Sequence, residues 1–126
     1  MRSRHRRARK LGKKIRYLSP DDLHELRIRI KKLRYAADFF RDLRPGKRTK
    51  LYLLALKDLQ QLLGTMHDAT VAAGLVAQIA QQSGAEAERA AMLVQRWANT
   101  CLKREGRKLP DVWCRFAKRK PPWKDG

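Results

Sequence analysis

The spacing of apolar residues after Ser19 is the feature that most restricts the fold. Between Pro20 and Leu43 the apolar side chains recur every three or four residues, at Leu23, Leu26, Ile30, Leu33, Ala37 and Phe40. This spacing places them along one side of an α-helix, as a seam that packs in a helical bundle. No stretch of useful length alternates polar and apolar residues, as a half-buried strand would. The sequence therefore predicts an all-α fold.

Capping and breaking residues divide the chain into helices. Ser19 can cap a helix and Pro20 suits the first helical turn, so a helix is expected to start there. It should stop before Pro45, because proline disfavours helix in the residue before it. Gly106 and Pro110 are expected to separate the last two helices. The expected helices span residues 20–43, 48–82, 86–105 and 111–117, about four in all, in an antiparallel bundle.

The charge balance indicates the class of partner. The chain of 126 residues carries 31 Lys and Arg against 12 Asp and Glu, a formal net charge of +19. An excess of this size favours polyanions. Because 43% of the residues are hydrophobic, a packed core is still expected, and the length suffices for one. We expect a basic N-terminal arm or an extra helix over residues 1–18, the bundle over 19–118 and a basic tail over 119–126.

The helix over residues 20–43 carries a second stripe beside its apolar seam. The stripe consists of His24, Arg27, Lys31 and Arg34, spaced three, four and three residues apart. At 1.5 Å per residue, its three permanent cations extend over about 10 Å. Like charges at these spacings repel one another, and a polyanion lying along the stripe would relieve the repulsion.

Two interpretations of this stripe are open. A run of charges is most often a solvated face. Here apolar residues also border the stripe on its far side, at Ile28, Tyr35 and Phe39, which favours the wall of a groove. Asp38 lies among the cations, where it could orient Arg34 or Arg41.

The sequence offers no catalytic or metal-binding constellation. His67 and Asp68 are adjacent, as in metal phosphohydrolases, but the chain has only three histidines, so a dinuclear metal site is not expected. There is no Ser-His-acid group and no glycine-rich phosphate loop. Cys101 and Cys114 lack the neighbours of a zinc site and are expected as free thiols. We expect a non-enzymatic protein with no metal, no cofactor and no membrane span.

Three segments share their order and spacing with a known family. They read LHELRIRIKKLRY over 23–35, LQQLLGTMHD over 59–68 and LPDVWCRF over 109–116. Together they resemble the CHAD family, the conserved histidine α-helical domain. The resemblance implies a helical bundle whose basic surface binds inorganic polyphosphate. By position it implies these polyphosphate-binding residues: His24, Arg27, Lys31, Arg34, Lys57 and His67. Arg16 and Arg41 are expected as secondary contacts.

The resemblance covers the C-terminal half of a CHAD domain, which is a double bundle. Two alternatives follow: the chain is a fragment or a stand-alone half-domain, with a separate N-terminal half as a partner, or two copies pair in a homodimer that rebuilds the groove. The alternative function is DNA or RNA binding, because a charge of +19 attracts nucleic acid whatever the fold. The family also implies a cytoplasmic location, in some members at polyphosphate granules.

Overall fold

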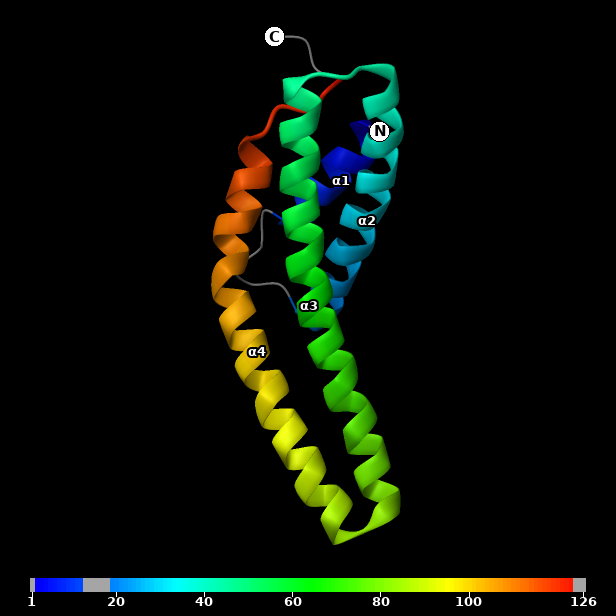
Figure 1. Cartoon of the computed structure of the whole chain (residues 1–126), viewed down its shortest axis with the longest axis vertical. Helices are drawn as coiled ribbons and strands as arrows, with labels where there is room; N and C mark the ends of the chain where they lie inside the picture. The colour runs from blue at the N-terminus through cyan, green and yellow to red at the C-terminus, as the bar shows by residue number, and fades with distance from the viewer. Residues whose placement is uncertain (1, 13–18, 124–126) are drawn as a thin grey trace. The chain divides into compact units, whose positions relative to one another are not determined.

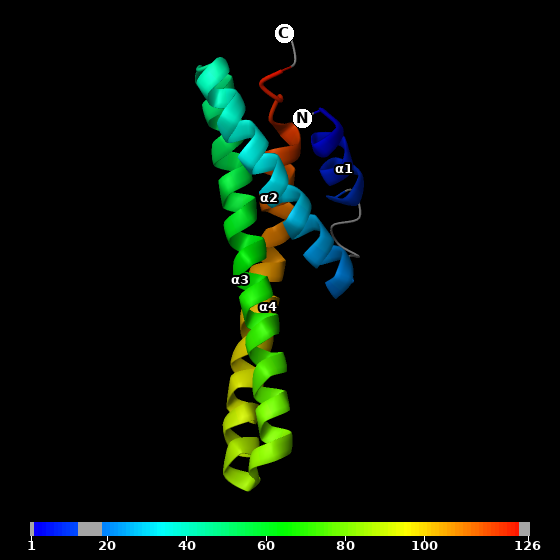
Figure 2. The same cartoon turned by 90° about the vertical axis from the view of Figure 1, so that its right-hand side faces the viewer.

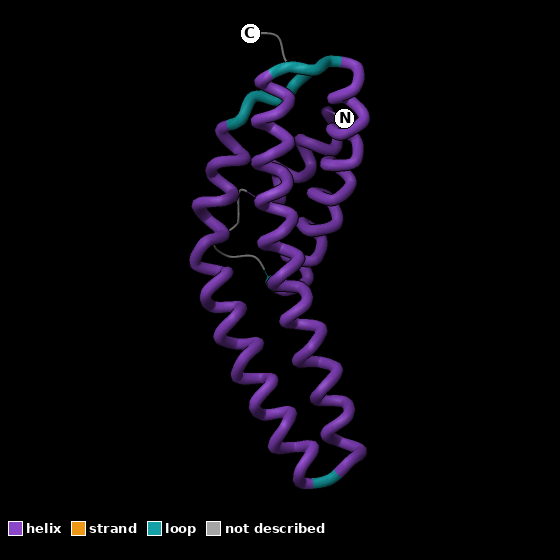
Figure 3. Tube along the Cα trace, in the orientation of Figure 1, coloured by secondary structure: helices purple, strands orange, loops and turns teal. Residues whose placement is uncertain are grey.

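The computed structural model describes residues 2–12 and 19–123. Its helices are α1 (Arg2–Gly12), α2 (Pro20–Leu43), α3 (Lys47–Ser83) and α4 (Ala85–Lys118) (Figure 1). Short loops join α2 to α3 and α3 to α4, and no strand occurs in the part of the chain that the structure describes (Figure 3). The predicted all-α fold is confirmed.

The chain folds into two compact units. The first combines Met1–Leu63 with Leu109–Gly126, so it holds α1, α2, the beginning of α3 and the end of α4. The second is Gly64–Lys108, which holds the remainder of α3 and α4. Most of the residues that carry the predicted site belong to the first unit.

Local hydrogen bonds define the ends of α2. The Ser19 hydroxyl oxygen accepts a hydrogen bond from the backbone N–H of Asp22 at 3.1 Å, which caps the helix. At the other end, the N–H of Arg44 donates to the carbonyl of Phe40 at 2.9 Å. The helix therefore starts after Ser19 and stops before Pro45, as the capping and breaking residues predict.

The core of the first unit contains the predicted seam of α2. Leu26, Ile30, Leu33 and Ala37 are fully buried, and the two end members of the seam, Leu23 and Phe40, are half-buried. The other helices of this unit contribute further fully buried residues: Ala8, Tyr52, Leu56, Leu59 and Phe116. Burial of this apolar surface is the main favourable contribution to the stability of the unit.

The described part of the N-terminal segment is a helix rather than an extended arm. α1 packs against α2, and Figure 2 shows it lying beside that helix and the end of α4. His5, Ala8 and Gly12 are buried, at the spacing of one helix face. A Cβ at Gly12 would lie only 2.0 Å from the Trp113 ring, so glycine permits this close approach.

Residues 119–123, expected as part of a basic tail, are held against the first unit. Pro121 and Pro122 are buried. The Trp123 ring lies edge-on to the rings of His5 and Tyr52, with centroid distances of 5.5 and 5.6 Å. The chain after α4 therefore follows a defined path up to Trp123.

α4 is one continuous helix, which corrects the predicted division into helices 86–105 and 111–117. Gly106 was expected to end the first of these and Pro110 to precede the second. Both residues lie inside Ala85–Lys118.

Burial on one side of α4 explains why the helix continues through Pro110. A proline inside a helix removes one backbone hydrogen bond and costs about 3 kcal/mol. Leu109, Trp113 and Phe116 are at most 6% exposed, so the turns around Pro110 bury three large side chains in the core. Burying each of them contributes about 1.5–3 kcal/mol, which offsets the cost of the proline.

Tyr52 should make the stability of the protein fall at alkaline pH. Its ring is fully buried and its hydroxyl shares a 2.6 Å hydrogen bond with Nδ1 of His5. Burial raises the pKa of this hydroxyl far above its ordinary value of about 10, and the positive charge of Arg9 opposes the shift only in part. The unfolded chain can release this proton above pH 10 but the folded chain cannot. Stability should therefore fall by about 1.4 kcal/mol for each pH unit above that value.

The variant Tyr52→Phe isolates this effect, because it keeps the ring and removes the titrating group. Its free energy of unfolding, measured by urea denaturation from pH 9 upward, should lack the extra alkaline decrease that the parent chain shows. Parallel pH profiles for the two proteins would show that Tyr52 ionises as easily in the folded state as in the unfolded state.

The second unit is an antiparallel helical hairpin. Gly84 joins its two helices with φ 89°, a left-handed conformation that favours glycine. Ala69, Ala98 and Cys101 form its buried cluster, and such small side chains let two helices approach closely. The predicted stop at Ser83-Gly84 is confirmed.

The sequence also led to expectations about the two cysteines and about membrane-spanning helices. Cys101, which is buried, and Cys114, which is exposed, are both free thiols, as predicted. None of the helices in the described ranges combines the length and the apolar character that a membrane crossing requires.

Candidate functional site

The predicted cationic stripe lies along α2. Because α2 is continuous from Pro20 to Leu43, its four members share one side of the helix: His24, Arg27, Lys31 and Arg34. Arg27 and Arg34 are half-buried, and the other two are exposed. The stripe therefore runs along the edge of the first unit, between the buried seam and water.

The far border of the stripe is open to water at its two aromatic residues, whereas Ile28 is half-buried. Tyr35 is 62% exposed and Phe39 is 70% exposed. These rings therefore do not form a second wall, and the wall opposite α2 has to come from another helix.

α3 provides that wall at one end of the stripe. A cavity of about 250 Å³ is lined by Arg34, Asp38 and Arg41 of α2 and by Lys50, Leu53, Leu54 and Lys57 of α3. Four of these seven side chains are cations and one is a carboxylate. A multiply charged anion is the ligand that such a lining favours.

Arg34 is held in place by contacts to both helices. Its Nη1 donates to Oε1 of Gln60 on α3 at 2.7 Å. Its Nε lies 3.9 Å from Oδ2 of Asp38, whose other oxygen lies 4.0 Å from Nη1 of Arg41. Asp38 thus lies between the two arginines, as the sequence suggested. Because partly exposed ion pairs contribute little stability, its main effect is to orient the guanidinium groups, whose remaining N–H donors can serve a ligand.

The lysines of α3 bring uncompensated charge to the cavity. Lys50 and Lys57 are both exposed, and within the described residues neither makes an ion pair. They are seven residues apart, so they lie on one side of α3 about 10 Å from each other along the axis. Lys57 was expected from the sequence and Lys50 was not, although this seven-residue spacing was the signal that could have found it.

Five of the eight predicted site residues are not placed in the lining of this cavity, and two of the five also lie off the α2 stripe. His67 belongs to the second unit, on the part of α3 that follows Leu63, where it is half-buried. Arg16 lies outside the described residues. Of the predicted residues, the structure brings Arg34, Arg41 and Lys57 together, and the α2 stripe leads away from them toward His24.

Comparison with known proteins places the chain in a family. The family model for the CHAD domain matches residues 1–77 of the 126. The chain belongs to the CHAD family. Comparisons with curated proteins and with solved structures gave no match.

The CHAD match includes the whole candidate site. Residues 1–77 contain every side chain that lines the cavity, the complete α2 stripe and His67. Two of the three segments on which the CHAD resemblance was based, 23–35 and 59–68, lie within the match, and the segment 109–116 lies beyond it. The family match therefore includes all four cations that line the cavity.

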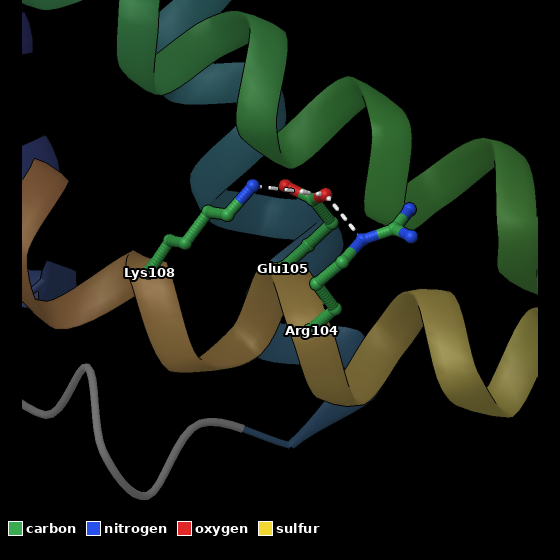
Figure 4. A network of polar contacts seen from close by, with 3 residues as sticks. All are labelled: Arg104, Glu105 and Lys108. Carbon is green, nitrogen blue, oxygen red and sulfur yellow. Dashed lines mark hydrogen bonds and ion pairs between the residues drawn. The ribbon is translucent and has the colours of Figure 1, made fainter.

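Two cations on α4 of this CHAD protein are differently placed. In the second unit, Glu105 of α4 is only 13% exposed and its Oε1 lies 3.2 Å from Arg104 Nε and 3.5 Å from Lys108 Nζ. Figure 4 shows the two cations on either side of this one carboxylate. Their charge is partly compensated within α4, unlike that of Lys50 and Lys57.

No metal site accompanies the cavity in the described ranges. Across residues 2–12 and 19–123, no three or more His, Cys, Asp or Glu side chains come together in a way that could hold a metal ion. The chemistry available at the cavity is that of guanidinium and ammonium groups, which bind and position anions.

Proposed function

We propose that this CHAD protein binds inorganic polyphosphate, without catalysing a reaction, in the cavity between α2 and α3. The observation that carries the proposal is the meeting of four cations from two helices at one cavity: Arg34, Arg41, Lys50 and Lys57. Polyphosphate is a chain of closely spaced anionic groups, so several of these cations can contact it at once. Membership in the CHAD family supports the same class of ligand.

Each type of side chain has a distinct part in this proposal. Arg34 and Arg41 can each donate two parallel hydrogen bonds to one phosphate group, which is a geometry that guanidinium groups favour. Lys50 and Lys57 supply compact positive charges on the opposite wall. Arg27, Lys31 and His24 extend the contact surface along α2.

A second candidate function is nucleic-acid binding. It is favoured by the exposed rings of Tyr35 and Phe39 beside the cationic stripe, because exposed aromatic side chains stack on unpaired bases. The net charge of +19 would attract DNA or RNA to the same surface. The two candidates differ in selectivity, since generic charge does not distinguish one polyanion from another.

Calorimetric titration in about 0.15 M salt tests the selectivity. Long-chain polyphosphate, duplex DNA and tRNA would be compared at equal phosphate concentration. We expect saturable binding of polyphosphate that is at least about tenfold tighter than that of either nucleic acid. Equal affinity for all three would reject the proposal and favour nucleic-acid binding through charge.

We further propose that this CHAD protein pairs with a second copy of itself or with a separate N-terminal CHAD half. Light scattering on the titration samples distinguishes the two. A doubled mass indicates a homodimer, and a monomer at every concentration, with and without polyphosphate, contradicts it. By the family resemblance, the protein would act in the cytoplasm, including at polyphosphate granules.

A further inference from the structure

A second basic cavity lies at the end of the first unit where α3 begins and α4 ends. It has a volume of about 320 Å³ and is lined by Lys47, Arg48, Leu51, Lys118, Arg119 and Lys120. Five of these six side chains are cations and none is a carboxylate. None of the described residues that the sequence predicts to bind polyphosphate lines this cavity.

The segment after α4 holds its cations in a defined place. The N–H of Arg119 donates to the carbonyl of Phe116 at 3.0 Å. Further along, Pro121 and Pro122 are buried, and Trp123 packs against the rings of His5 and Tyr52. Because the backbone is fixed on both sides of Lys120, little backbone conformational entropy is lost when an anion binds there.

The start of α3 adds a second source of positive potential. Lys47 is the first residue of α3, and the first backbone hydrogen bond at this end runs from the N–H of Lys50 to the carbonyl of Gly46 at 3.0 Å. The opening N–H groups of a helix carry partial positive charge and attract anions. Here that end coincides with a cavity already lined by cations.

The two basic cavities lie on neighbouring sides of the same turns of α3. Lys50 and Leu54 line the first cavity, whereas Lys47 and Leu51 line the second. At 100° per residue, Leu51 and Leu54 are about 60° apart around the helix, and Lys47 and Lys50 differ by about 4.5 Å along its axis. A flexible anion that extends out of one cavity can therefore pass around the first turns of α3 into the other.

We propose that the second cavity is an additional phosphate-binding subsite, and that a long polyphosphate chain occupies both cavities by passing around the start of α3. This inference rests on the proposed function, because the same ligand links the two sites. Binding at two linked sites makes the second contact intramolecular, so affinity increases with chain length. Short phosphates occupy the cavities independently.

The variant Lys47→Ala/Arg119→Ala tests this subsite. Both side chains are exposed, and the backbone hydrogen bond of Arg119 does not depend on its side chain. The matched control is Arg89→Ala/Lys103→Ala, which removes the same two residue types from exposed positions of α4 in the second unit. Each double variant lowers the net charge equally, so a difference between them reports position rather than total charge.

Calorimetry with tripolyphosphate and with long-chain polyphosphate provides the readout. The subsite variant should bind long-chain polyphosphate at least about tenfold more weakly than the control variant does. With tripolyphosphate, it should lose one of two binding events and keep the other. If the two variants bind both ligands equally, the subsite does not exist.

A second variant keeps the test independent of folding. Lys47→Glu places an acid in the first turn of α3, where negative charge stabilises a helix while repelling phosphate. It should melt no lower than the parent chain and still lose the second binding event, and unchanged binding would overturn the subsite. Failure of the proposed function has a different signature, because then the parent chain itself shows no preference for polyphosphate over nucleic acid.

Discussion

Replacing Arg34 and Lys57 together with alanine should weaken the binding of long-chain polyphosphate by about 100-fold. The two side chains lie on opposite walls of the first cavity, so the variant removes one cation from each helix. A hydrogen bond to a charged group contributes about 1.5–3 kcal/mol, and two such losses account for the expected change. Calorimetric titration in about 0.15 M salt gives the affinity of the variant and the parent chain.

The fold should survive this change. Arg34 is one-third exposed, Lys57 is exposed and Gln60, which loses its partner, is half-buried and can turn to water. Arg89→Ala/Lys103→Ala is again the charge-matched control, and its affinity should stay within about threefold of the parent value. Equal losses in the two double variants would mean that total charge, and not the cavity, binds the polyanion.

The outer part of the α2 stripe can be examined in the same way. Arg27 and Lys31 lie beyond the lining of the cavity, so Arg27→Ala/Lys31→Ala should cost less affinity than the cavity variant. The reverse order would locate the main contact along α2, away from α3.

Replacing Phe116 with alanine should destabilise the first unit by about 3–5 kcal/mol. Phe116 is fully buried, and its ring lies 5.7 Å from that of His5, 5.6 Å from Tyr52 and 5.3 Å from Trp113 between centroids. These partners belong to α1, α3 and α4. Removing the Phe116 ring therefore weakens the packing among three helices. Because the free energy of unfolding of such a domain is only about 5–15 kcal/mol, this loss should clearly lower the midpoint of urea denaturation.

Cys114→Ala is the matched control for this prediction. Cys114 lies two residues away on the same turn of α4, where it is exposed, so the substitution should change stability by less than about 0.5 kcal/mol. Similar midpoints for the two variants would show that α4 does not pack on the core beyond Pro110. The expected contrast would confirm that burial of this turn offsets the helix-breaking effect of the proline.

Local patterns in the sequence were sufficient for α2 and its stripe. The apolar seam, the cap at Ser19 and the spacing of Arg27, Lys31 and Arg34 depend only on residues within a few turns of one another. For the same reason, the position of Asp38 between Arg34 and Arg41 could be anticipated from spacings of four and three residues. Helical geometry alone relates such residues in space.

The cavities could not be anticipated in this way. Lys50 lines a cavity with Arg34 only because α2 docks on α3. Lys47 lines a cavity with Arg119 only because the start of α3 lies near the end of α4. Each pair consists of residues that are far apart in sequence. No local periodicity reports the relative position of two helices, which is set by how their side chains interdigitate.

The sequence by itself determined the helical class, the seam of α2, the cationic stripe and the excess of positive charge that selects a polyanion. The tertiary structure decided that residues 2–12 form a packed helix, that α4 continues through Pro110 and that Trp123 packs against the ring of Tyr52. The physical reason is the range of the interactions. Spacing and capping act within a few turns, whereas these three outcomes depend on burial of side chains against distant segments, which overrides local preferences.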